Sequence, residues 1–208
     1  MKDLVILGIG VHAAEMVEII ERINGVAPTW NLLGFIAERE MPIGSMVNRL
    51  PVLGFGDAWQ QFPQAQCALS FGWPWELLPP RERLVTIIDP STFVSRTASF
   101  GVGCVIYPNC FIGLNVKLGD YVFCLSGCTI NHDNVLEDKV TLASGVKLAG
   151  EIHIETECYL GQACTIRQQL RIGRNSTIGM GAVVVKDVLP NSTMVGNPAR
   201  QIKKKEAK

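Results

Sequence analysis

The chain has 208 residues, 48% of them hydrophobic and 18% charged, which is enough apolar material for one large domain or two small ones. Lys+Arg and Asp+Glu both number 19, so the charge balance gives no sign of a nucleic-acid partner or of binding to a membrane surface. No apolar stretch approaches the roughly 20 residues needed to span a bilayer. The seven cysteines, without CxxC pairs, argue against a disulfide or zinc framework, and a cytoplasmic protein is expected.

The chain begins with a pattern of strand, glycine turn and helix. An apolar run at 4–7 precedes Gly8 and Gly10, and apolar residues at helical spacing follow. Amides at such a helix start can hold an anion, although any tight turn from strand to helix can use a GxG pair. Strands are also expected at 32–36, 67–71 and 84–88, and the prolines of "LLPPRERL" mark a helix start. This alternation predicts a small, mostly parallel α/β sheet.

A six-residue repeat organises the second half of the chain. Every sixth residue from Val94 to Val184 is apolar, over sixteen consecutive positions, which neither a helical nor a strand period produces. The residue four positions later is mostly small or β-branched. The residue directly after the apolar one is often glycine, which we expect at corners with unusual backbone angles. Short strands between such corners would wind into a solenoid, with six of the seven cysteines as core fillers.

This repeat resembles the hexapeptide repeat of the left-handed parallel β-helix over about residues 92–190. A short Rossmann-like domain that leads into such a helix resembles the NeuD/PglD family of sugar acetyltransferases. The matching segments are "LVILGIGVHA", "LLGFI", "LPVLG", "DPS", "INHDNVLED", "LAG" and "IGMGAVVVKDVLPNSTMVGNPAR". The resemblance implies a Rossmann-like α/β sugar-nucleotide-binding domain at 1–90. It also implies a left-handed β-helix acetyltransferase domain with a basic C-terminal tail at 91–208.

His132 lies two residues beyond the interior position Ile130, so we expect its side chain on a face or edge of the solenoid. One coil is three hexads, so Gly150 should lie beside His132 in the next coil, about 4.8 Å away. A histidine can take a proton near pH 7, and an amide can stabilise an oxyanion. The family resemblance implies that His132 is the general base, that Asp133 increases its basicity, and that the amide of Gly150 binds the thioester carbonyl.

The resemblance also implies acetyl-CoA as co-substrate, direct transfer without a metal, and a homotrimer in whose grooves the cofactor lies. The residues implied at the cofactor are Thr141, Gln162, Met180, Gly181, Pro198 and Arg200, with Lys203, Lys204 and Lys205 near the CoA phosphates. The residues implied at the sugar nucleotide are Gly10, Val11, His12, Ala37 and Glu38. Such a nucleotide-sugar enzyme would serve polysaccharide biosynthesis.

The chain departs from the family mainly in the half expected to recognise the acceptor. Relatives often carry a second histidine at the position of Thr141, acidic residues after "LLGFI", and a polar turn where this chain has "FGWPW". The expected acceptor is the amino group of a nucleotide-linked 4-amino sugar, and O-acetylation of a sialic acid or related sugar is the alternative.

Two alternatives belong to other functional classes. A metal-dependent enzyme of the γ-carbonic anhydrase type needs three converging histidines. Only His132 and His153 lie in the solenoid, and His153 is interpreted as a surface residue at a corner. A non-catalytic sugar-nucleotide-binding or scaffold protein is the second alternative, against which the intact "NHD" and "LAG" segments argue.

Overall fold

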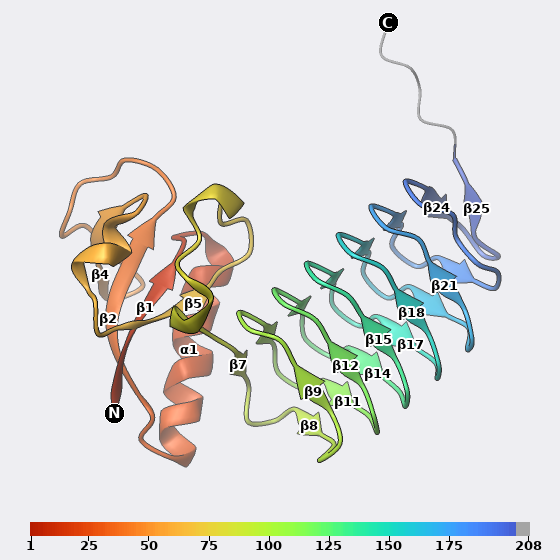
Figure 1. Ribbon diagram of the computed structural model, residues 1–208, viewed down its shortest axis with the longest axis horizontal. Coiled ribbons are helices and arrows are strands. Elements are labelled where there is room, and N and C mark those ends of the chain that lie inside the picture. Colours follow the sequence, from red (N-terminus) through yellow and green to blue (C-terminus); the bar gives the residue numbers. More distant parts are fainter. Residues whose placement is uncertain (203–208) are drawn as a thin grey trace, which may run out of the picture. The chain divides into compact units, whose positions relative to one another are not determined.

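The computed structural model describes residues 1–202, which divide into two compact units (Figure 1). The first unit comprises Met1–Pro90 together with Val102–Val105, and the second comprises Ser91–Gly101 and the chain from Ile106 onward. The predicted fold class, a Rossmann-like α/β unit followed by a left-handed parallel β-helix, is confirmed. The predicted cofactor contacts Lys203, Lys204 and Lys205 lie outside the described residues. Across residues 1–202, no helix has the length and apolar character of a membrane span.

The first unit is built on a six-stranded sheet in the order β3-β4-β2-β1-β5-β6, accompanied by helix α1 (Val11–Val26). Its strands are β1 (Lys2–Leu7), β2 (Trp30–Ala37), β3 (Met46–Val47), β4 (Leu50–Phe55), β5 (Gln66–Leu69) and β6 (Leu84–Val85). β1 is parallel to both β2 and β5, one on each side, and its residues from Leu4 to Leu7 are fully buried. Their carboxyl ends therefore meet at one edge, where the strand order reverses and open α/β sheets bind ligands.

The structure differs from the sequence-based prediction in the connections of this sheet. Strand β4 has no counterpart among the predicted strands, since Pro51 and Gly54 mask its pattern. The segment 84–88 is divided into β6 and β7 (Ile87–Ile88), because β6 pairs with β5 while the Ile87 N–H donates to the carbonyl of Cys104. The proline-rich segment begins no α-helix. Short 3₁₀ turns stand instead at Ala58–Gln61, Trp75–Leu77 and Arg81–Arg83.

An ion pair with a buried carboxylate joins α1 to the end of the first unit. Asp89 is fully buried, and its carboxylate accepts hydrogen bonds from Nε and Nη2 of Arg22 at 2.7 and 3.0 Å. We expect Arg22→Ala to lower the free energy of unfolding, because the buried carboxylate of Asp89 loses the two charge-assisted hydrogen bonds from the guanidinium. Urea denaturation measures the loss. The control is Arg49→Ala, whose guanidinium lies 3.9 Å from Glu21 with both side chains exposed, and equal losses would contradict the prediction.

The second unit is a solenoid of short strands arranged in three sheets, here named faces 1, 2 and 3. Face 1 carries β10 (Val105–Ile106), β13 (Phe123–Cys124), β16 (Thr141–Leu142), β19 (Tyr159–Leu160), β22 (Thr177–Ile178), β24 (Thr193–Val195) and β25 (Arg200–Gln201). Face 2 carries β8 (Phe93–Val94), β11 (Phe111–Ile112), β14 (Thr129–Ile130), β17 (Lys147–Leu148), β20 (Thr165–Ile166) and β23 (Val183–Val184). Face 3 carries β9 (Ser99–Phe100), β12 (Lys117–Leu118), β15 (Val135–Leu136), β18 (His153–Ile154) and β21 (Arg171–Ile172).

The register of the faces shows how the repeat builds the solenoid. Thr129 pairs in parallel with Lys147, 18 residues on, so one coil contains three hexads as expected. From β10 to β23 the second residue of each strand is buried, and Ile130, Leu148 and Ile166 are fully buried. All seven cysteines are free and buried, and six of them are the solenoid cysteines predicted to be core fillers.

The glycines that follow the aliphatic positions have a different role from the predicted one. These residues are Gly101, Gly113, Gly119, Gly161, Gly173 and Gly179. Their φ angles are not in the left-handed region. A Cβ added to any of them would, however, lie 2.2 to 2.9 Å from an atom of the next coil. Glycine is needed there because the coils approach closely. The left-handed angles fall further along each corner, at residues such as Asn115 and Asp133, both with φ of 58°. Asn and Asp tolerate this conformation better than most residues.

Candidate active site

The corner between faces 2 and 3 brings together the three residues predicted to be catalytic. His132 and Asp133 lie between β14 and β15, and Gly150 lies one coil on, between β17 and β18. An added Cβ on Gly150 would lie 2.4 Å from Cε1 and 2.6 Å from Nε2 of His132, so the imidazole lies directly against the glycine. Within residues 1–202 the Gly150 N–H has no hydrogen-bond acceptor. This corner therefore offers a base and a spare amide donor side by side.

Asp133 orients the imidazole of His132. Its Oδ2 lies 2.9 Å from Nδ1 of His132, and its Oδ1 accepts a hydrogen bond from Nδ2 of Asn115 at 2.9 Å. These two hydrogen bonds, that of Asn115 first, hold the pKa of Asp133 below its usual value. Since an ionised carboxylate only accepts, Nδ1 carries the hydrogen and Nε2 presents its lone pair. The side chain of His132 is 56% exposed, so this basic nitrogen is accessible and does not belong to the core.

Asn134 supports the corner from inside the solenoid. Its side chain is fully buried, and Nδ2 donates to the carbonyl oxygens of Asn131 and Ala149 at 2.9 and 2.7 Å. Its Oδ1 accepts a hydrogen bond from the N–H of Ile152 at 2.8 Å. These bonds tie together the two coils that carry His132 and the glycine beside it, so Asn134 is a structural residue of the site.

Residues predicted to bind the cofactor lie on other parts of the solenoid. Gln162, Met180 and Gly181 lie at the corner between faces 1 and 2, where the N–H of Gly181 donates to the carbonyl of Gln162 at 2.8 Å. Met180 is 77% exposed. Thr141 lies in β16, on face 1. Within a single chain, face 2 separates the corner that carries Met180 from the corner that carries His132.

The last two predicted cofactor residues lie near the end of the described chain. Pro198 is exposed and follows a cis peptide bond with Asn197. Arg200, in β25, lines a pocket of about 330 Å³ together with Lys186 and Asp187. An exposed cation in such a pocket is suited to an anionic group such as a phosphate.

The residues predicted at the sugar nucleotide surround the carboxyl ends of β1 and β2. Gly10 is the N-cap of α1, and no side chain caps the helix there. Val11 is 74% exposed. His12 contacts the ring of Phe71 edge-on, with 5.7 Å between ring centroids, and its Nδ1 lies 3.1 Å from a carboxylate oxygen of Glu15. The aromatic Phe71, which follows β5, is the residue of this edge that sequence reasoning did not assign to the site.

Ala37 and Glu38 differ in what they can contact. Ala37 is fully buried at the end of β2, and its carbonyl accepts a hydrogen bond from the N–H of Gly56. The side chain of Ala37 is therefore covered by the protein itself. Glu38 is half-buried and is the first residue beyond the strand with a polar side chain at this edge.

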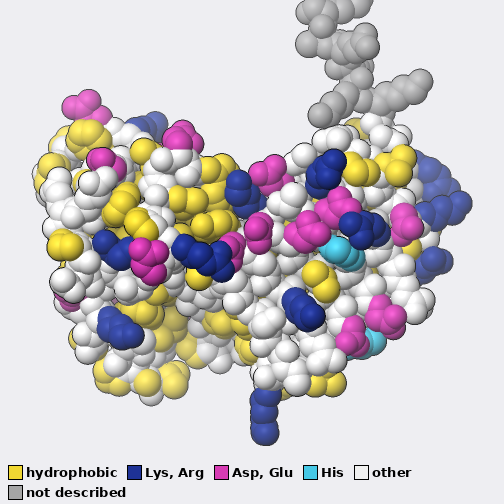
Figure 2. Space-filling view, in the orientation of Figure 1, with side chains coloured by type: hydrophobic (Ala, Val, Ile, Leu, Met, Phe, Trp, Pro, Cys, Tyr) yellow, Lys and Arg dark blue, Asp and Glu magenta, His cyan; other side chains and the backbone are white. Residues whose placement is uncertain are grey.

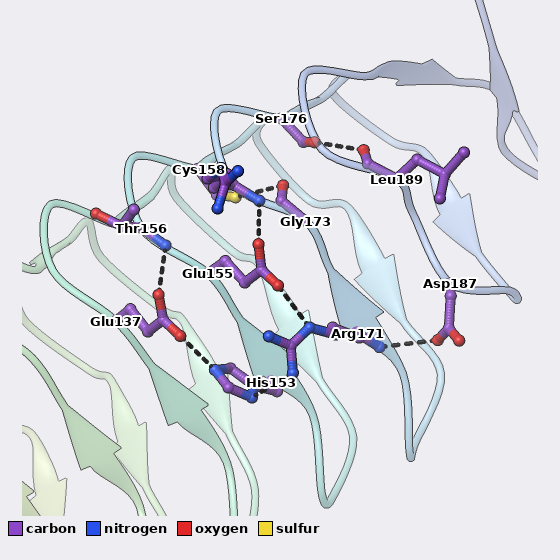
Figure 3. A network of polar contacts seen from close by, with 11 residues as sticks. Glu137, His153, Glu155, Thr156, Cys158, Arg171, Gly173, Ser176, Asp187 and Leu189 are labelled. Atoms are coloured by element: carbon purple, nitrogen blue, oxygen red, sulfur yellow. Dashed lines mark hydrogen bonds and ion pairs between the residues drawn. The ribbon is translucent and has the colours of Figure 1, made fainter.

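His153 belongs to a network of polar contacts on face 3, not to a corner (Figure 3). Its Nε2 lies 2.7 Å from Oε1 of Glu137, and its Nδ1 lies 3.2 Å from a guanidinium nitrogen of Arg171. Because a guanidinium only donates, Nδ1 accepts and Nε2 donates to Glu137. Glu155 extends the network by accepting from Arg171 and from the N–H of Arg174. The interpretation of His153 as a plain surface residue was therefore incomplete, since its imidazole links two neighbouring coils.

This network lies on a surface of mixed charge. Acidic, basic and histidine side chains are interspersed over the face of the solenoid seen in Figure 2. Within residues 1–202, no three His, Cys, Asp or Glu side chains come close enough together to hold a metal ion.

The network predicts a pH dependence of stability. Hydrogen bonds from the N–H of Arg174 and from the guanidinium of Arg171 lower the pKa of Glu155. A carboxyl group with a depressed pKa stabilises the fold above its unfolded pKa, and the contribution is lost as the pH falls through the folded pKa. We expect the unfolding free energy to fall more steeply in the wild type than in Glu155→Gln below about pH 5. Urea denaturation at pH 6 and pH 3 tests this, and equal slopes would contradict it.

Comparison with curated proteins finds relatives of the solenoid. No protein-family profile matches the chain. A putative acetyltransferase of Schizosaccharomyces pombe is 39% identical over 95 residues, which are 46% of this chain and 43% of that protein. The acyl-[acyl-carrier-protein]–UDP-N-acetylglucosamine O-acyltransferase of Gloeothece citriformis is 33% identical over 84 residues, 40% of this chain and 30% of that protein. The chain thus spans less than half the length of these relatives.

Solved structures match over nearly the whole chain. The acetyltransferase domain of PglB from Neisseria gonorrhoeae, solved with acetyl coenzyme A, matches with a TM-score of 0.83 and 26% identity, over 97% of this chain and 99% of that one. The GDP-perosamine N-acetyltransferase of Caulobacter crescentus matches with a TM-score of 0.84 and 22% identity, over 98% of each chain, and shows the same fold. Both likenesses include the α/β unit as well as the solenoid.

Proposed function

We propose, from the confirmed resemblance to the NeuD/PglD-like sugar acetyltransferases, that the chain transfers an acetyl group from acetyl-CoA to a sugar. The preferred acceptor is the amino group of a nucleotide-linked 4-amino sugar. One observation carries the proposal: the imidazole of His132, held by Asp133, lies against the amide-bearing Gly150 on an exposed corner. Of the two solved structures described above, one is an acetyltransferase domain with bound acetyl coenzyme A and the other is named a GDP-perosamine N-acetyltransferase, which supports the choice of co-substrate and of an amino group as acceptor.

The reaction needs only these groups and the two substrates. Nε2 of His132 takes a proton from the acceptor amine as the nitrogen attacks the thioester carbonyl carbon. The Gly150 N–H donates to the carbonyl oxygen as it gains negative charge, a contribution of about 3–4 kcal/mol in comparable sites. The tetrahedral intermediate collapses, the carbon–sulfur bond breaks, and the departing thiolate takes the proton from the imidazolium. The product is the acetamide, and no acyl-enzyme forms.

We also propose that three copies of the chain assemble around a threefold axis. The predicted cofactor residues around Met180 and the base His132 lie at different corners of one solenoid, so one chain does not bring them together. In a cyclic trimer, the corner of one copy that carries Met180 faces the corner of its neighbour that carries His132. The cofactor would then lie between two solenoids. The free cysteines favour a reducing compartment, for which we propose the cytoplasm.

We propose that the nucleotide binds at the sheet edge of the first unit where the carboxyl ends of β1, β2 and β5 meet. Parallel strands β1, β2 and β5 end together there, beside the uncapped start of α1. Backbone amides at a helix start favour an anionic group such as a diphosphate. His12 and Glu38 supply polar side chains at the same edge, and the ring of Phe71 supplies an exposed apolar surface.

The proposal is tested by incubating the protein with acetyl-CoA and a panel of nucleotide-linked amino sugars and neutral sugars, while following thiol release. We expect turnover with an amino sugar. Turnover only with hydroxyl acceptors would support the same mechanism of acetyl transfer but would assign the function as O-acetylation of a sialic acid or related sugar. If the protein shows no turnover and does not bind acetyl-CoA, the alternative of a non-catalytic binding or scaffold protein is favoured.

A further inference from the structure

A ladder of polar side chains runs along the catalytic corner through successive coils. The hydroxyl oxygen of Thr97 accepts a hydrogen bond from the backbone N–H of Asn115 at 2.8 Å. The side-chain amide of Asn115 in turn donates to Oδ1 of Asp133 at 2.9 Å, while Oδ2 of Asp133 holds the imidazole of His132. Thr97, Asn115 and Asp133 are 18 residues apart along the chain, so each lies directly against the next in the neighbouring coil. Asn115 thus contacts the base only through the carboxylate.

We infer that Asn115 is a positioning residue, which fixes the carboxylate of Asp133 so that His132 presents Nε2 as the base. The inference rests on the proposed function for its catalytic meaning. The carboxylate of Asp133 is 47% exposed, and its orientation is not fixed by burial. Among the described residues, each of its two oxygens has one partner, and the partner of Oδ1 is the amide of Asn115. Removing that amide lets the carboxylate rotate and leaves Nδ1 without a fixed acceptor.

The backbone places the two side chains at a suitable separation. Asn115 and Asp133 share the left-handed φ of 58°, so their Cβ atoms leave neighbouring coils in the same direction. Adjacent parallel strands lie about 4.8 Å apart, a spacing that a short amide and a short carboxylate bridge with one hydrogen bond. The same hydrogen bond is the largest cause of the lowered pKa of Asp133, which keeps the acceptor ionised. The amide therefore supports both the position and the charge of the carboxylate.

A comparable hydrogen bond at the same corner, between Gln169 and Glu151, provides a control for the substitution of Asn115. Nε2 of Gln169 donates to Oε2 of Glu151 at 3.1 Å, another amide-to-carboxylate bond between residues 18 positions apart. Both residues adopt left-handed angles, with φ of 60° and 59°. Gln169→Ala therefore removes an equivalent hydrogen bond from the same corner without affecting the contact between Asp133 and His132.

Two readouts test the inference on the full chain. With ¹⁵N-labelled histidine, NMR spectra report which ring nitrogen of His132 carries the hydrogen, and His132→Ala assigns the signal among the three histidines. We expect Asn115→Ala to shift His132 from the form protonated at Nδ1 to a mixture of tautomers. We also expect kcat for acetyl transfer to fall about tenfold with little change in acceptor KM, as for the loss of a hydrogen bond to a charged group. Asn115→Asp, which replaces the donor by a second acceptor, should have a larger effect than the alanine.

The outcomes separate this inference from the proposed function. Gln169→Ala should leave both the tautomer and kcat at wild-type values. An unchanged tautomer in Asn115→Ala would overturn the inference, as would equal effects of the Asn115 and Gln169 variants. A tautomer shift in a protein that acetylates no acceptor would support the positioning role while refuting the proposed transfer reaction.

Discussion

His132→Ala is expected to lower kcat/KM for acetyl transfer about 10³-fold, the middle of the range for loss of a general base. Nε2 of His132 is the accessible basic nitrogen at the corner, because Asp133 accepts the hydrogen of Nδ1. Without the imidazole, the acceptor amine must lose its proton to water. The measurement is thiol release with saturating acetyl-CoA and the best acceptor from the panel, for the variant and the wild type.

The fold should survive this substitution, because the side chain of His132 is half exposed. Acetyl-CoA binding should be retained, which isothermal titration can verify. The matched control is His153→Ala, the other histidine of the solenoid, whose imidazole links Glu137 and Arg171. That variant should lose stability and keep its rate constants. Wild-type turnover in His132→Ala would refute the assignment of the base.

Gly150→Ala is expected to lower kcat/KM about 10²-fold, comparable to losing one oxyanion donor. The added methyl would lie 2.4 Å from Cε1 of His132, so the imidazole has to swing away from Asp133 and from the bound thioester. The backbone of Gly150 is not in the left-handed region, so it can accept alanine without strain. The loss should therefore appear in the rate constants and much less in the unfolding free energy.

Gly25→Ala is the control for this glycine substitution. It lies in α1, and nothing comes within 4 Å of an added Cβ there. Alanine should raise the stability of the helix by about 0.5–1 kcal/mol and leave turnover unchanged. The test compares both variants in denaturation and in thiol release. A Gly150→Ala enzyme with wild-type activity would show that the contact between the glycine and the imidazole has no role in catalysis.

The sequence by itself determined the solenoid architecture and which residues meet at the centre of the candidate site. A six-residue apolar period is produced by neither an isolated helix nor a flat strand, so it predicts a solenoid. Once the coil length is 18 residues, the separation of His132 and Gly150 places them in neighbouring coils, and the structure has their side chain and backbone in contact. Period and spacing sufficed here, because the relation between coils is the same everywhere in a repeat.

Only the tertiary structure decided which side chains meet across the coils. The glycines serve close approach instead of unusual backbone angles, as Gly113 shows against the backbone of the next coil. The bond from Asn115 to Asp133, the buried Asn134 and the network around His153 also went unpredicted. Such contacts depend on side-chain rotamers and on hydrogen-bond donors and acceptors that differ from coil to coil. The six-residue period of the sequence therefore does not predict them.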